Sequence, residues 1–123
     1  MLPFEITVHQ AKELLDSTAT NSTATNSTTT SAPPRVRLID VREPWEAQRA
    51  RIPGSELIPM NEFAARAHQE LDPEDHLLIV CKMGGRSLSV TNWLRKQGFE
   101  TAQSVAGGID AWSRQIDPSI PRY

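Results

Sequence analysis

A strongly apolar run, HLLIV at 76–80, leads directly into the glycine-rich stretch CKMGGRS at 81–87. Four consecutive aliphatic residues are typical of a strand that is buried on both faces of a sheet. The segment 87–97 that follows has apolar residues at helical spacing and ends before Gly98, a common helix stop. The pattern therefore predicts a central strand, a tight loop and a helix.

The same alternation of extended runs and amphipathic segments recurs along the chain. We expect strands at 4–8, 36–41, 57–60, 76–80 and 102–105, and helices at 9–15, 44–51, 61–71, 87–97 and 109–116. Pro44 is expected in the first turn of the second helix, and Asn61 is expected to cap the third. This order predicts an α/β fold, with a central parallel sheet of about five strands and helices on both faces.

The segment 17–34 has a different composition. It reads STATNSTATNSTTTSAPP and carries no charge and no large apolar side chain. Such a segment cannot bury enough surface to offset the entropy lost on ordering. We expect a low-complexity flexible loop here, inserted in a single domain that spans 1–123, because 123 residues leave little room for a second domain.

Charge and composition argue against several classes of function. The formal net charge of −2 provides no basic surface for nucleic acid or for an anionic membrane, and no apolar run could span a bilayer. The start of the sequence lacks the layout of a secretory signal, and one cysteine cannot form an internal disulfide, so a cytoplasmic protein is expected. The histidines at 9, 68 and 76 show no metal-ligand spacing, so we expect no metal and no other cofactor.

Cys81, the only cysteine, stands where the central strand ends. A strand that enters a glycine-rich turn and then a helix forms an anion cradle, because backbone N–H groups converge there and the helix N-terminus adds positive charge. We expect the amides of 82–87 to surround the Cys81 sulfur, and Lys82 and Arg86 to favour the nucleophilic thiolate. A cysteine after an apolar strand can also serve packing alone, but two glycines and two cations beside it favour a functional role.

The spacing of the loop separates the possible chemistries. Cysteine phosphatases and arsenate reductases require a C-x5-R loop, whereas Cys81 and Arg86 form C-x4-R. A smaller ring of amides suits a sulfur atom or a small oxyanion better than a phosphate ester. No second cysteine is present for a C-x-x-C redox pair. A lone activated thiolate fits covalent relay of a group on sulfur, most simply as a persulfide.

Four parts of the sequence resemble the rhodanese homology domain. They are LIDVRE (38–43), IPGS with a following IP (52–55 and 58–59), CKMGGRS (81–87), and GF, V and GGIDAW (98–99, 105 and 107–112). The resemblance covers nearly the whole chain apart from the 17–34 insertion. The chain departs from the family pattern at Arg51, Ser55 and Ala106, where histidine, alanine and leucine are common.

The resemblance implies roles for individual residues. Cys81 would be the nucleophile that bears the persulfide. The residues that bind its outer sulfur, or a thiosulfate anion, would be Lys82, Met83, Gly84, Gly85, Arg86 and Ser87, the last of which would open the next helix. Asp40 and Arg42 would lie beside the loop, where Asp40 would orient a donor or a loop arginine. A purely structural ion pair is the alternative for both, and Trp112 is expected in the core.

The resemblance also implies a function, that of a thiosulfate sulfurtransferase that works in two steps. Cys81 would take sulfane sulfur from a small sulfur-containing anion such as thiosulfate and pass it to cyanide, a thiol or a carrier protein. Residues 112–123 are similar to rhodanese domains fused behind adenylyltransferases, so a sulfur-acceptor protein or an adenylyltransferase in trans is an expected partner. A non-enzymatic sulfur-carrier or docking module is the alternative, and a cysteine phosphatase is a more distant one.

Overall fold

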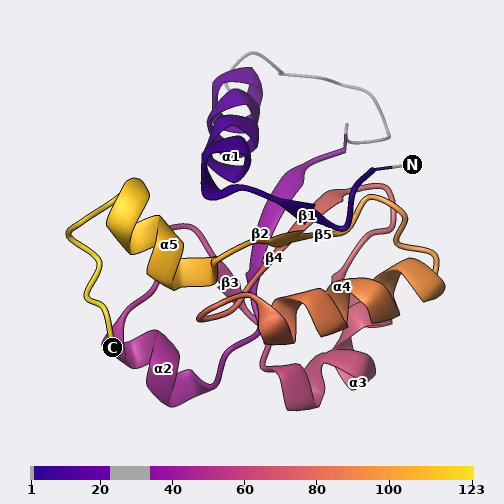
Figure 1. Ribbon diagram of the computed structural model, residues 1–123. Helices are drawn as coiled ribbons and strands as arrows, with labels where there is room; N and C mark the ends of the chain where they lie inside the picture. The colour runs from indigo at the N-terminus through magenta and orange to yellow at the C-terminus, as the bar shows by residue number, and fades with distance from the viewer. Residues whose placement is uncertain (1, 23–33) are drawn as a thin grey trace.

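The sheet at the centre of the molecule has five strands, all of them parallel. The computed structural model describes residues 2–22 and 34–123, and its strands lie in the order β1-β5-β4-β2-β3 (Figure 1). Their bounds are Glu5–Ile6 for β1, Val36–Asp40 for β2, Glu56–Leu57 for β3, His76–Val80 for β4 and Gln103–Val105 for β5. The predicted α/β fold with a parallel sheet is confirmed.

Helices cover both faces of this sheet (Figure 1). They are α1 (Val8–Ser22), α2 (Pro44–Arg49), α3 (Met60–Glu70), α4 (Gly85–Lys96) and α5 (Gly108–Gln115). α1 and α5 lie on one side, α3 and α4 on the other, and α2 lies near the ends of the central strands. None of the described helices is long and apolar enough to cross a membrane.

The central strands divide the core into two layers because neighbouring side chains point to opposite faces. Leu38 and Leu78 belong to the cluster under α1 and α5, whereas Ile39 and Ile79 belong to the cluster under α3 and α4. All four are fully buried, which accounts for the uninterrupted apolar runs in the sequence.

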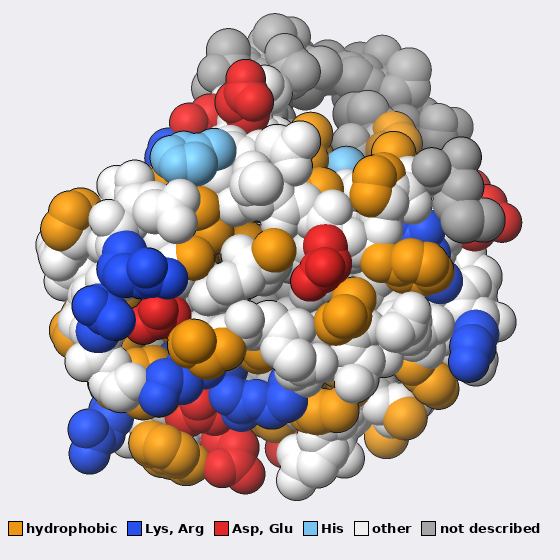
Figure 2. Space-filling view, in the orientation of Figure 1, with side chains coloured by type: hydrophobic (Ala, Val, Ile, Leu, Met, Phe, Trp, Pro, Cys, Tyr) orange, Lys and Arg blue, Asp and Glu red, His pale blue; other side chains and the backbone are white. Residues whose placement is uncertain are grey.

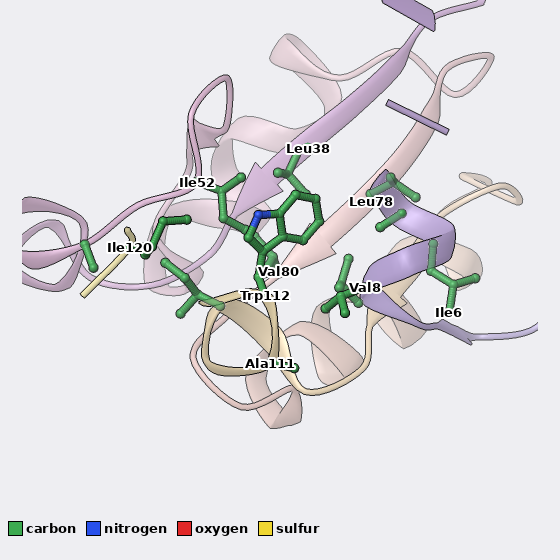
Figure 3. Close-up of a cluster of buried hydrophobic side chains, with 13 residues drawn as sticks. Ile6, Val8, Leu38, Ile52, Leu78, Val80, Ala111, Trp112 and Ile120 are labelled. Carbon is green, nitrogen blue, oxygen red and sulfur yellow. The ribbon is translucent and has the colours of Figure 1, made fainter. Parts of the chain in front are cut away.

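Trp112 is a core residue, as expected. It lies on α5, is only 4% exposed, and packs with Ile52, Val80 and Ile120 (Figure 3). The indole thus anchors α5 against the sheet, and α5 in turn contacts the loop that follows β4.

The pairing of β2 with β4 brings two separate parts of the sequence together. Asp40 lies beside Val80 in the parallel register, and the Val41 amide donates to the Val80 carbonyl at 3.0 Å. The residues that follow the two strands therefore meet at the carboxyl edge of the sheet, where α/β proteins commonly bind ligands.

Several boundaries differ from the expectation: β1 spans only Glu5–Ile6, and Val8, expected in that strand, begins α1. α1 continues to Ser22, whereas we expected loop from residue 17, because the tract contains no glycine or proline before Pro33 to stop a helix. The expected loop over 23–33 lies outside the described residues. Asn61 does not cap α3, since the amide of Met60 donates to the Val41 carbonyl and the helix begins at Met60, directly after Pro59.

Candidate active site

The sulfur of Cys81 lies inside the turn formed by the residues that follow it. The Gly84 amide donates to Sγ at 3.1 Å and the Ser87 amide at 3.3 Å, while the Ser87 hydroxyl oxygen lies 3.4 Å from Sγ. Cys81 itself is 1% exposed. Backbone amides therefore hold the sulfur, as the sequence predicted, and two of them contact it directly.

Gly84 makes this turn possible. Its φ of 113° lies in a region that side chains disfavour, and a Cβ there would stand 3.3 Å from the Gly107 amide nitrogen. α4 begins at the next residue, Gly85, so Ser87 is its third residue rather than its first. The N–H groups of Gly85 and Arg86 have no acceptor within the helix, because they lie in its first turn. They add to the positive end of the α4 dipole beside Cys81.

A pair of buried serines supports the loop from below. The Ser87 hydroxyl lies 2.7 Å from the Ser104 hydroxyl on β5 and donates to the Gly84 carbonyl at 3.1 Å. Ser87 and Ser104 are both fully buried. The two hydroxyls thus fix the turn that carries the amides around Sγ.

The start of α5 closes the other side of the loop. The Ile109 amide donates to the Cys81 carbonyl at 2.8 Å, and the Asp110 amide donates to the Lys82 carbonyl at 3.1 Å. Gly108 lies so close to these carbonyls that a Cβ at this position would stand 2.3 Å from the Cys81 oxygen. The first two residues of the loop are therefore docked onto a second helix N-terminus.

Arg86 is held by a carboxylate from another element. Its guanidinium donates two hydrogen bonds, at 2.6 and 3.0 Å, to the carboxylate of Glu46 on α2. Glu46 is only 3% exposed. The Glu46 carboxylate raises the pKa of Arg86, and the nearby Cys81 adds to this effect. The Arg86 charge is thus permanent and lies within electrostatic range of the sulfur.

Asp40 and Arg42 form a buried ion pair. The Arg42 guanidinium donates to the Asp40 carboxylate with a shortest distance of 2.6 Å and to the Ala50 carbonyl at 2.7 Å. Both side chains are almost completely inaccessible. The Asp40 carboxylate accepts hydrogen bonds from Arg42, two residues away, while the loop arginine, Arg86, binds Glu46 instead. This geometry favours the structural ion pair, and a role of Asp40 in orienting a donor stays a prediction.

The Lys82 side chain packs against the Tyr123 ring. Its ammonium nitrogen lies 4.6 Å from the centre of the Tyr123 ring. Among the described residues, neither Lys82 nor Arg86 donates a side-chain hydrogen bond to Sγ. The charges of the loop therefore act through space, while the amides make the contacts. Figure 2 shows basic and acidic side chains side by side on the part of the surface formed by α2 and α5.

The sequence also matches a known protein family. The family model of the Rhodanese-like domain matches residues 23–115. The chain belongs to the rhodanese-like domain family. In this domain the residues from Cys81 to Gly84 link β4 to α4, and Arg86 lies in the first turn of α4. The resemblance noted from four short motifs is thus confirmed over most of the chain.

Relatives of this rhodanese-like domain include parts of larger proteins. A rhodanese-like/PpiC domain-containing protein 12, chloroplastic, of Arabidopsis thaliana is 46% identical over 90 residues, which are 71% of this chain and 30% of the relative. The adenylyltransferase and sulfurtransferase uba4 of Ogataea parapolymorpha is 33% identical over 86 residues, 70% of this chain and 22% of the relative. The chain thus spans less than a third of the length of these two proteins.

Solved structures of similar size have the same fold. The human single-domain sulfurtransferase TSTD1 is 25% identical, with a TM-score of 0.71, and the match covers 93% of this chain and 98% of that one. SSP1007 of Staphylococcus saprophyticus is 28% identical, with a TM-score of 0.68 and coverage of 97% and 99%. Both agree with a rhodanese-like domain that folds around a single sheet, and the family relationship connects the chain to sulfur transfer.

Three residues of the site were not predicted from the sequence. Glu46 binds Arg86, Tyr123 contacts Lys82, and Ser104 supports Ser87. Ser104 had a weak local signal, since it is one of two adjacent polar residues, with Gln103, in the short segment 102–105 expected as strand. Glu46 and Tyr123 had none, because their partners lie far away in the sequence. No group of three or more His, Cys, Asp or Glu side chains within 2–22 and 34–123 could hold a metal ion.

The charged residues beside the loop predict how stability depends on pH. The hydrogen bond from Arg86 lowers the pKa of Glu46 from 4.5 to about 2, so its contribution to stability is complete above pH 4.5 and is lost as the pH falls through about 2. Burial raises the pKa of Tyr123 from 10.0 to about 12, so its contribution is complete below pH 10 and is lost as the pH rises through about 12.

Urea denaturation measures the acidic half of this profile. Between about pH 7 and about pH 3 we expect the free energy of unfolding of the natural protein to fall by about 2 kcal/mol more than that of a Glu46→Gln variant, because only the former titrates Glu46. The other carboxylates are common to both proteins and cancel in the comparison. If the free energy of unfolding falls equally in the two proteins, Glu46 does not have the lowered pKa described above.

Proposed function

We propose that the protein is a sulfurtransferase that carries sulfane sulfur as a persulfide on Cys81. The observation that carries the proposal is the pair of amides, from Gly84 and Ser87, that donate to Sγ. Amides in this position stabilise negative charge on sulfur, both on the attacking thiolate and on the persulfide that replaces it. The N–H groups of Gly85 and Arg86, in the first turn of α4, remain available to the outer sulfur of that persulfide.

The proposed reaction has two steps and returns the enzyme unchanged. The Cys81 thiolate attacks the sulfane sulfur of thiosulfate; a new S–S bond forms, the S–S bond of thiosulfate breaks, and its electron pair leaves with sulfite. A thiophilic acceptor such as cyanide then attacks the outer sulfur of the persulfide, and the electron pair of that bond returns to Cys81 as thiocyanate leaves. A thiol or a carrier protein would accept the sulfur in the same way.

Intact-mass spectrometry tests the proposal. Incubation with thiosulfate is expected to add the mass of one sulfur atom to the chain, and cyanide is expected to remove it with release of one equivalent of thiocyanate. Cys81 is the only cysteine, so the adduct has a single possible thiol site. A protein that gains no sulfur under these conditions, or that keeps it in the presence of cyanide, would refute the two-step mechanism.

A second function deserves testing because the matched relatives are parts of larger proteins. In this alternative the domain carries sulfur, or docks a partner, without rapid turnover of small donors. Persulfide formation in the mass experiment together with slow steady-state thiocyanate production would favour the carrier. Its acceptor would then be a protein, which an adenylyltransferase acting in trans would activate.

A cysteine phosphatase fits the site less well. Only four residues separate Cys81 from Arg86, one fewer than in the phosphatase loop. The two terminal nitrogens of Arg86 also donate to Glu46, which leaves fewer of its N–H groups to bind a phosphate ester. Hydrolysis of an aryl phosphate that depends on Cys81 would revive this alternative.

A further inference from the structure

The segment after α5, residues 116–123, folds back toward the loop and ends beside α2 (Figure 1). Ile120 is buried in the cluster under α1 and α5, and the Ser113 hydroxyl donates to its carbonyl at 2.6 Å. Arg122 donates to the Asp110 carboxylate at 3.0 Å. The path of the segment is thus fixed, and it places the side chain of Tyr123 between the loop and α2.

The Tyr123 hydroxyl joins two charged groups of the site. It accepts a hydrogen bond from the Arg42 guanidinium at 2.8 Å and donates one to the Glu46 carboxylate at 2.7 Å. Glu46 uses the same carboxylate to hold Arg86. The hydroxyl therefore fixes the partner of Arg86, and its donated proton offsets part of the negative charge that Glu46 would otherwise present to the loop.

The Tyr123 ring contacts the other cation of the loop. The Lys82 ammonium lies 4.6 Å from the ring centre, a distance at which the ring attracts a positive charge. The edge-on contact of the ring with Trp45, at 6.2 Å between centres, keeps the ring in this orientation. One side chain thus restrains Lys82 directly and Arg86 through Glu46.

Building on the proposed sulfur transfer, we propose that Tyr123 is a positioning residue for the anionic sulfur donor. Its ring and hydroxyl hold Lys82 and Arg86, the two positive charges of the loop, in fixed places before the donor arrives. Fixed charges bind an anion better than mobile ones, because the entropy of ordering them is not lost on binding. Tyr123 should therefore govern the binding of the donor and should have little influence on the transfer of sulfur itself.

Steady-state kinetics of Tyr123→Phe and Tyr123→Leu test this role. The first variant loses the hydroxyl and keeps the ring, and the second loses both. With thiosulfate as donor and cyanide as acceptor, we expect KM for thiosulfate to rise about 3- to 10-fold for Phe and further for Leu, with kcat changed by less than about twofold. The singly charged donor methanethiosulfonate should show a smaller rise. Arg114→Gln, which breaks an exposed ion pair with Asp110, is the control and should match the natural protein.

Alkylation of Cys81 tests the same proposal without sulfur transfer. The ratio of its rates with iodoacetate, an anion, and iodoacetamide, which is neutral, reports the positive potential at the sulfur. We expect this ratio to fall by about threefold or more in both Tyr123 variants. If the natural protein transfers no sulfur, the proposed function fails and this ratio still decides the role of Tyr123. The proposal is overturned if the Tyr123 variants keep or increase the alkylation ratio and keep or lower KM for thiosulfate. A lower melting temperature alone would show that Tyr123 serves only stability.

Discussion

The Cys81→Ser protein is expected to form no persulfide and to lose sulfur transfer by about a thousandfold or more. The reason is chemical, since a serine hydroxyl is a poor nucleophile toward sulfane sulfur and cannot form the S–S bond on which the mechanism depends. The fold should survive, because serine is no larger than cysteine and its oxygen can accept the amides of Gly84 and Ser87. The assay is thiocyanate formation from thiosulfate and cyanide, with intact mass as the second readout.

Ser89→Ala provides the matched control for this variant. Ser89 lies on the exposed side of α4, the helix that begins in the loop, and its hydroxyl is not part of the cradle around Sγ. The control should keep both thiocyanate formation and the sulfur adduct. Sulfur transfer at a natural rate by Cys81→Ser, with the control equally active, would show that the reaction does not take place on Cys81.

Gly108→Ala is expected to reduce stability and activity together. A Cβ at this position would stand 2.3 Å from the Cys81 carbonyl oxygen and 2.5 Å from the Lys82 carbonyl oxygen, and both are backbone atoms that cannot turn aside. Either α5 or the loop must move, and the amides that dock onto these carbonyls move with it. We expect a loss of about 3 kcal/mol in the free energy of unfolding, and a melting temperature lower by about 10 °C.

Gly54→Ala is the control that distinguishes the steric overlap at Gly108 from the effect of a positive φ alone. Both glycines have a positive φ, 86° at Gly54 and 58° at Gly108, but a Cβ at Gly54 would meet no atom within 4 Å. Its cost should be that of the conformation alone, about 1–2 kcal/mol, and sulfur transfer should be unaffected. Calorimetry and the thiocyanate assay measure both variants. Equal losses of stability, with activity kept in each, would mean that contact between Gly108 and the loop does not matter.

The parts of the fold that could be predicted are those with a local signal. β4 has the bounds expected from HLLIV, because a strand buried on both faces must be apolar throughout. The turn around Sγ was also predictable, since Gly84 and the start of α4 lie within a few residues of Cys81. Where two local signals competed, as at Asn61, the contact of Met60 with the neighbouring strand decided the helix start.

The parts that could not be predicted depend on contacts distant in sequence. Glu46 meets Arg86 across 40 residues and meets Tyr123 across 77 residues, and composition or periodicity has no means of pairing them. The sequence shows that Lys82 and Arg86 belong to the loop, but it does not show that Tyr123 and Glu46 contact them. Asp40 and Arg42 are the opposite case, because they are close in sequence and bind each other.

Main-chain amides donate the hydrogen bonds to Sγ, so the groups that support the reaction are distinct from the side chains that can select the donor. The donors are the backbone N–H groups of Gly84 and Ser87, so the side chains of Lys82 and Met83 can change while the hydrogen bonds to Sγ stay as they are. Met83 is already 61% exposed, outside the packed interior. These two positions can therefore be redesigned for donors of different charge or shape on an unaltered reaction centre.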